Sequence, residues 1–148
     1  MKKTKFLTIA ACMALAFGAS AVAGDKTDAI LKEAMKVDVA KTCDPQKNSV
    51  TKLLAVAKKY NPTAVKLGVE FKRLGMTTTQ YIQETQKALK AKSKTVTLLD
   101  KNGKPTDKKV SVDYAAERAC KFAVRALQEY VDAQTTYKLA IPGEGYTY

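Results

Sequence analysis

Two cysteines and a cluster of lysines are the residues whose types and spacing could carry chemistry in this chain. The 148 residues contain no histidine, which removes the commonest general base and transition-metal ligand. No serine or cysteine lies in a nucleophile-elbow pattern, and Cys43 and Cys120 are too far apart for a C-x-x-C redox pair. Two cysteines without histidine do not suit a structural zinc site. We therefore expect no enzymatic activity, no metal site and no cofactor.

The first 23 residues have the pattern of a cleaved secretory signal peptide. Three lysines among the first five residues precede an apolar run over 6–17, and Ala21-Val22-Ala23 forms an A-x-A cleavage site. The run is too short for a permanent transmembrane span, and no second long apolar segment follows. We expect a periplasmic or secreted protein that does not span the membrane. The alternative, a lipoprotein site at Cys12, is disfavoured because the apolar run continues beyond that residue.

Cleavage near Ala23 would remove Cys12 and leave Cys43 and Cys120 in a mature chain of about 125 residues. Two cysteines in an oxidising compartment favour a single disulfide. The alternative is a pair of buried free thiols. A chain of this length is enough for one domain with one core, so we expect a single helical domain over 24–148.

The mature chain is strongly basic, since the loss of three lysines lowers the net charge only from +12 to +9. Its only arginines are Arg73, Arg118 and Arg125. Lysine is a hydrated point charge, whereas arginine supplies the planar fork that specific recognition uses. The bias towards lysine therefore indicates general attraction to anionic surfaces and no specific binding of nucleic acid.

The densest group of lysines is the candidate site for an anionic partner, such as an envelope surface or an acidic protein. With no interleaved aromatic residues beyond Tyr81, a platform for single-stranded nucleic acid is not indicated. The alternative is a solvated lysine-rich loop without a partner. The group comprises Lys87, Lys90, Lys92, Lys94, Lys101, Lys104, Lys108 and Lys109.

The hydrophobic period predicts two helices in the first part of the mature chain. Thr27 is the expected cap of a helix that runs to about Val39, and Ser49 is the expected cap of the next. A loop over 41–48, which contains Cys43, separates them. The pair Asn61-Pro62 is expected to end the second helix and to begin a third.

The third helix should end at Gly75 in a left-handed C-cap. Thr77 and Gln80 have capping-box spacing and predict a fourth helix that runs to about Ala91. Its inward face is expected to be Tyr81, Ile82, Thr85, Ala88 and Leu89.

Between about 94 and 112 the pattern changes to alternating β-branched residues around the turn signal Asn102-Gly103, which predicts a β-hairpin. Asp113 is the expected cap of a long helix to about Leu139, followed by an irregular C-terminal tail. The inward face of this helix is expected to be Ala116, Cys120, Ala123, Leu127 and either Tyr130 or Val131. The predicted fold class is mainly α: a bundle of four to five helices with one small β-hairpin and one disulfide.

One segment resembles a known family. Leu54-Ala55-Val56, then Tyr60 and Pro62-Thr63-Ala64-Val65, is similar at the same spacing to a segment of the HdeA-type periplasmic acid-stress chaperones. The positions of Cys43 before this segment, and of Cys120 within 112–120, resemble the settings of the two family cysteines. The spacing from Cys43 to Cys120 is longer than in the family pattern, and the hairpin and the long C-terminal helix stand outside it. The resemblance implies a small exported helical protein with one disulfide and no enzymatic activity.

These observations favour two non-enzymatic functions, and the third alternative is an enzyme of an unsuspected type, which a pocket with converging carboxylates would indicate. The resemblance implies a holdase that binds unfolded clients in acid, when protonation of 14 carboxylates raises the side-chain charge and favours expansion. The alternative is a neutral-pH binding protein, of the inhibitor or immunity type, for an envelope enzyme or an anionic envelope component. Both act through binding to a partner and not through turnover.

Overall fold

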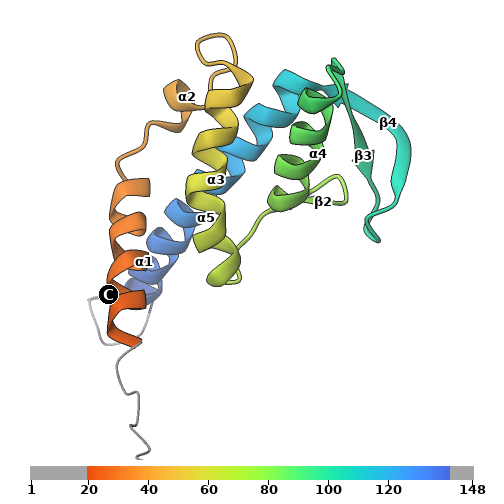
Figure 1. Ribbon diagram of the computed structural model, residues 1–148. Helices are drawn as coiled ribbons and strands as arrows, with labels where there is room; N and C mark the ends of the chain where they lie inside the picture. The colour runs from red at the N-terminus through yellow and green to blue at the C-terminus, as the bar shows by residue number, and fades with distance from the viewer. Residues whose placement is uncertain (1–19, 141–148) are drawn as a thin grey trace, which may run out of the picture.

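The structure is a computed structural model that describes residues 20–140, with side chains from 26 to 136. Most of the predicted signal peptide (1–19) and the predicted C-terminal tail (141–148) lie outside the described residues. The described chain forms five helices and two antiparallel two-stranded sheets (Figure 1). In chain order the elements are α1 (Ser20–Ala34), α2 (Val39–Thr42), α3 (Val50–Lys66), β1 (Lys72–Arg73), β2 (Met76–Thr77), α4 (Thr78–Lys90), β3 (Thr95–Leu99), β4 (Pro105–Ser111) and α5 (Val112–Ala140).

The predicted fold class is confirmed: the protein is mainly helical, with five helices, the expected hairpin β3–β4 and one disulfide. The small sheet formed by β1 and β2 was not expected. Helix α5 is the centre of the bundle, packing most extensively on α3 and next on α4 (Figure 1). Its buried face includes four alanines, Ala115, Ala116, Ala119 and Ala123, whose small side chains let the neighbouring helices approach closely.

Helix α3 continues through Pro62, so the prediction of two separate helices around this residue is wrong. Buried Leu53, Ala57, Tyr60 and Ala64 form one continuous stripe along α3. Burial of this stripe outweighs the hydrogen bond that a proline removes from a helix interior.

The residue that ends α3 is Gly68, not Gly75. Gly68 has a φ of +72°, its amide donates to Val65 O, and the Val69 amide donates to Ala64 O at 2.9 Å. This is the hydrogen-bond pattern of a Schellman motif, in which glycine occupies the left-handed position at low cost. The predicted third helix over 62–74 is therefore absent, and the segment after Gly68 forms a loop and the β1–β2 hairpin.

Two other predicted helix ends differ from the structure. Helix α1 begins at Ser20 and ends at Ala34 instead of running from Thr27 to Val39, and α2 follows after a turn. At the start of α5, the hydroxyl of Ser111 and not the carboxylate of Asp113 accepts the capping hydrogen bond, from the Tyr114 amide at 3.1 Å.

The predicted cap at Ser49 and the capping box of Thr77 and Gln80 are confirmed. Of the predicted inward residues of α4, four are buried, whereas Leu89 is exposed. In α5, Ala116, Cys120, Ala123 and Leu127 are buried as predicted, and Tyr130 and Val131 are half-buried.

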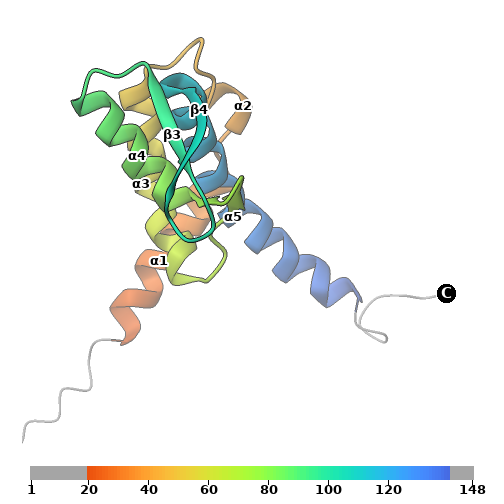
Figure 2. The same cartoon turned by 90° about the vertical axis from the view of Figure 1, so that its right-hand side faces the viewer.

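The β1–β2 turn lies directly against the end of the β3–β4 hairpin (Figure 2). Leu74 and Gly75 both have positive φ, at +53° and +86°, as the central residues of a type I′ turn require. A Cβ atom on Gly75 would lie 2.9 Å from the carbonyl oxygen of Leu99. Glycine at this position therefore permits the close approach of the two hairpins.

The C-terminal part of α5 extends away from the bundle (Figure 2), and residues 132–136 are exposed. Within residues 20–140, none of the helices combines the length and apolar character that crossing a bilayer requires.

Candidate functional site

All three arginines of the chain line one surface cavity of about 400 Å³. Arg73 comes from β1, whereas Arg118 and Arg125 come from the middle of α5. The lining is completed by Phe71, Lys72, Lys121, Phe122 and Glu129. We call this site the arginine cavity. Its lining contains five cationic side chains and a single carboxylate.

Helix α5 supplies one wall of the arginine cavity through a single face. Arg118, Phe122, Arg125 and Glu129 follow one another at spacings of four, three and four residues, which place side chains on the same side of a helix. The alanine-rich part of α5 is buried in the core. The same helix therefore fixes two arginines relative to the core.

The loop that precedes Arg73 is held by a polar network around Glu70. Oε1 of Glu70 accepts hydrogen bonds from Asn61 Nδ2 at 3.1 Å, from the Thr79 amide at 2.6 Å and from the Thr79 hydroxyl at 2.5 Å. The Thr79 amide belongs to the first turn of α4, where a carboxylate is favoured by the helix dipole. The network ties the loop before β1 to both α3 and α4.

A buried tyrosine of α4 contacts the backbone of Arg73. The hydroxyl of Tyr81, whose side chain is fully buried, donates a hydrogen bond to the carbonyl oxygen of Arg73 at 3.4 Å. Burial and the nearby Tyr114 raise the pKa of Tyr81, while Arg118 and Arg73 oppose the shift. The hydroxyl therefore keeps its proton at neutral pH and remains a donor to the Arg73 carbonyl.

Arg118 is held by aromatic rings. Its guanidinium carbon lies 4.8 Å from the centre of the Tyr114 ring and 5.9 Å from that of Phe122, within the range of cation–π attraction. Phe122 in turn packs edge-to-face against Phe71 and Tyr81, with ring centroids 5.8 and 6.1 Å apart. The guanidinium group is thus held in place without a carboxylate.

The arginines have no ionic partner within the described side chains. Five ion pairs form among residues 26–136, and each of them uses a lysine. Lys121, for example, pairs with Glu117 at 2.5 Å. In the same part of the chain, Nε of Arg118 is buried and has no hydrogen-bond partner. A buried donor without a partner costs about 1–3 kcal/mol, more when it is charged.

This arrangement suits an oxyanion. The planar guanidinium group matches the geometry of phosphate and carboxylate, and charge-assisted hydrogen bonds are the stronger kind. A phosphate or carboxylate group in the cavity would meet Arg118 already held by its aromatic neighbours, and so the cost of ordering this side chain would be small.

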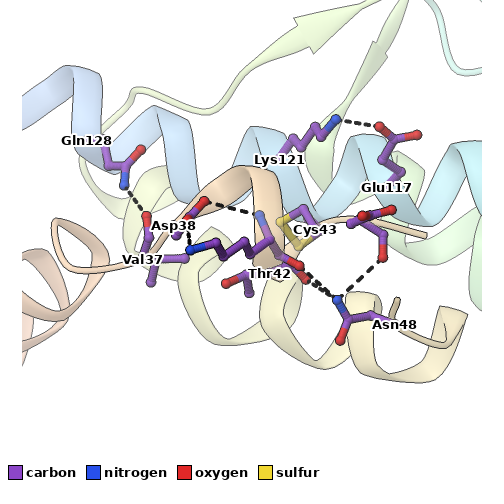
Figure 3. Close-up of a disulfide and its surroundings, with 11 residues drawn as sticks. Val37, Asp38, Thr42, Cys43, Asn48, Glu117, Lys121 and Gln128 are labelled. Atoms are coloured by element: carbon purple, nitrogen blue, oxygen red, sulfur yellow. Dashed lines mark hydrogen bonds and ion pairs between the residues drawn. A yellow bond between two sulfur atoms is a disulfide. The ribbon is translucent and has the colours of Figure 1, made fainter. Parts of the chain in front are cut away.

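The predicted disulfide between Cys43 and Cys120 is confirmed, with both residues fully buried and their Cα atoms 5.6 Å apart (Figure 3). Asn48 Nδ2 donates to the carbonyl oxygens of Thr42 and Asp44 and so closes the loop that carries Cys43. Nearby, Gln128 Nε2 donates to the carbonyl oxygen of Val37 at 3.0 Å (Figure 3). The α1–α2 segment is therefore fastened to α5 at two points.

The eight lysines of the predicted patch are all exposed, but the structure divides them between the end of α4, the segment after it and the β3–β4 hairpin. Four lie at the end of α4 and before β3, two lie in the β3–β4 turn and two lie in β4. None of them lines the arginine cavity. In chain order they are Lys87, Lys90, Lys92, Lys94, Lys101, Lys104, Lys108 and Lys109.

The sequence prediction missed the arginine cavity because it treated the scarcity of arginine as evidence against a specific site. A signal was present in α5, since Arg118, Lys121 and Arg125 have the spacing of a basic helix face. The approach of Arg73 to that face depends on the β1–β2 hairpin, which the sequence analysis assigned to a helix.

Comparison of the chain with protein-family models, with curated proteins and with solved structures found no match. The functional argument therefore depends on the geometry of the chain itself.

Proposed function

We propose that this protein is a non-enzymatic binding protein of the periplasm or of the secreted fraction, and that it binds an oxyanion-bearing envelope ligand in the arginine cavity. The observation that carries this proposal is that three arginines without a carboxylate partner among residues 26–136 line one cavity. An oxyanion there would offset the positive charge of the three arginines, none of which has a carboxylate partner in the described part of the chain.

Two observations support an extracytoplasmic location. The first 23 residues have the signal-peptide pattern, and the Cys43–Cys120 bond suits an oxidising compartment.

The holdase function implied by the HdeA-type resemblance remains an alternative proposal. It rests on the similarity of the 54–65 segment and on the settings of the two cysteines. We favour the binding function because the arginine cavity supplies an independent geometric reason for it.

Isothermal titration calorimetry with inorganic phosphate tests the proposed function. Arg118→Gln removes the guanidinium group but keeps a long polar side chain, and loss of one charge-assisted contact of about 1.5–3 kcal/mol weakens binding by about 10- to 150-fold. Arg118→Lys keeps the charge without the planar fork, and we expect it to bind more weakly than wild type as well.

The matched control is Lys58→Gln, which removes one charge from an exposed position on α3. We expect it to leave phosphate affinity within about twofold of wild type, because screening weakens the influence of distant exposed charges. Equal losses in Arg118→Gln and Lys58→Gln, or no binding of phosphate by the wild-type protein, would refute the proposed function.

A further inference from the structure

We infer that the arginine cavity is one end of a longer cationic track, and that the ligand is a linear polyanion with oxyanions repeated along its chain. The inference rests on the proposed function and extends it from a single oxyanion to a polymer. We define the cationic track as the arginine cavity together with Lys101, Lys104 and Lys108 of the β3–β4 hairpin.

The arginine cavity and the hairpin are neighbours because the β1–β2 turn lies between them. Arg73 lines the arginine cavity, and the next residue, Leu74, lines a second cavity of about 220 Å³. The second cavity is also lined by Leu99, Asp100 and Lys108 of the hairpin. A Cβ atom on Gly75 would lie 3.3 Å from the amide nitrogen of Lys101. Two adjacent residues of one turn thus line one cavity each, and the hairpin tip lies beside that turn (Figure 2).

The hairpin part of the track carries cations whose charges are available to a ligand. Lys101, Lys104 and Lys108 are exposed, and none of them forms an ion pair within the described side chains. The neighbouring Asp100 is occupied by the turn, where its Oδ1 accepts hydrogen bonds from the amides of Asn102 and Lys104, each at 2.8 Å. Asp107 is exposed in β4, the strand that carries Lys108. With this carboxylate included, the net charge of the hairpin part is still positive.

The shape of the track favours a polymer chain over a flat membrane surface. Arg118 lines a recess between β1 and α5, whereas a planar array of headgroups presents its charges to a flat surface. A narrow chain can place one oxyanion in the recess and pass its neighbours along the turn to the lysines. Leu74, which lines the second cavity and is 55% exposed, offers apolar contact to an uncharged part of such a chain.

The test compares inorganic phosphate with long-chain inorganic polyphosphate, and the triple variant Lys101→Gln/Lys104→Gln/Lys108→Gln with wild type. The track predicts that this variant binds polyphosphate about tenfold more weakly but keeps its affinity for inorganic phosphate within about twofold. Because the variant releases fewer counterions on binding, its slope of log K against log salt should be less negative by about 2, at roughly 0.7 for each lost contact with a flexible polyanion.

The matched control is Lys36→Gln/Lys52→Gln/Lys58→Gln, which removes the same charge from exposed positions outside the track. We expect its salt slope to equal that of wild type. Arg118→Gln should weaken binding of both phosphate and polyphosphate. Polygalacturonate, a chain of carboxylates, shows which kind of oxyanion the track prefers. Binding as tight as that of polyphosphate would assign a general polyanion site, and much weaker binding would assign a site for phosphate groups.

Three results would overturn the inference while leaving the proposed function intact. The first is an equal loss of polyphosphate binding in the two triple variants, which would mean non-specific attraction to a basic protein. The second is unchanged polyphosphate binding in Arg118→Gln. The third is binding to vesicles of anionic lipid, but not to polyphosphate, which would assign a membrane surface. Loss of phosphate binding in Lys58→Gln to the same degree as in Arg118→Gln would instead refute the proposed function.

Discussion

Removal of the Cys43–Cys120 disulfide is expected to cost a large fraction of the stability of the fold. The bond joins residues 77 positions apart, and in the chain-entropy model a loop of this size stabilises the folded state by about 4.5 kcal/mol. Domains of this size are stable by about 5–15 kcal/mol in total. The reduced protein should therefore be only marginally stable.

Urea unfolding followed by circular dichroism measures this effect in three proteins: oxidised wild type, wild type reduced with dithiothreitol, and the Cys43→Ala/Cys120→Ala variant. With a slope of about 1.5–2 kcal/mol per molar urea, the midpoint should fall by about 2–3 M in both proteins that lack the bond. Where they remain folded, they should still bind phosphate, because the rings of Tyr81, Tyr114 and Phe122 position the arginine cavity independently of the bond.

A common midpoint for oxidised and reduced wild type would refute the reasoning about the disulfide. Loss of phosphate binding in a reduced protein that retains its full helical signal would contradict the independence of the cavity from the bond.

Three further predictions concern the turns and the response to acid. Gly75→Ala places a Cβ atom 2.9 Å from the Leu99 carbonyl oxygen at a positive φ, so we expect a loss of about 2 kcal/mol or more in urea unfolding; an unchanged midpoint would contradict the close approach. Lys92→Gly relieves a left-handed residue with a φ of +53° at the end of α4, and we expect a gain of about 1 kcal/mol, which a lower midpoint would disprove. The backbone amide of Lys41 and, to a smaller degree, the Lys41 side chain lower the pKa of Asp38. The backbone amide of Gln46 and, to a smaller degree, the Lys47 side chain lower the pKa of Asp44. Because the folded-state pKa values lie below the unfolded value of 3.8, these carboxylates stabilise the fold above about pH 4 and lose that effect as pH falls through their folded pKa values. Asp38→Asn/Asp44→Asn should therefore show a shallower loss of stability between about pH 4 and 2, and parallel pH profiles would refute this assignment.

The parts of the fold that the sequence predicted are those with a local signal. The capping box at Thr77 and Gln80 and the turn at Asn102-Gly103 each lie within a few residues, and both are confirmed. The disulfide was predicted because only two cysteines would remain after the expected cleavage of a signal peptide. Each of these signals could be recognised without knowledge of distant contacts.

The end of α3 was not predicted because a local rule and a tertiary effect disagree there. Pro62 is normally a helix breaker, yet the buried stripe of Tyr60 and Ala64 continues past it. Gly68, which ends the helix, lay inside the helix that the sequence analysis expected. The error then removed the β1–β2 hairpin from the prediction.

The arginine cavity was missed for a related reason. Arg118 and Arg125 have the spacing of one helix face, but Arg73 joins them only through the misassigned hairpin. The predicted lysine patch, in contrast, grouped residues by their nearness in sequence, and the structure spreads these lysines along the hairpin and the end of α4.

The most direct measurement is a titration of the Nε–Hε signals of arginine with inorganic phosphate, followed by NMR. The chain has three arginines, so that each signal can be assigned with one substitution. Arg73, Arg118 and Arg125 line the same cavity, and we predict that all three signals shift together along one binding curve, with that of Arg118 shifting most. Three signals that stay unmoved, or that shift with unrelated affinities, would contradict a common oxyanion site.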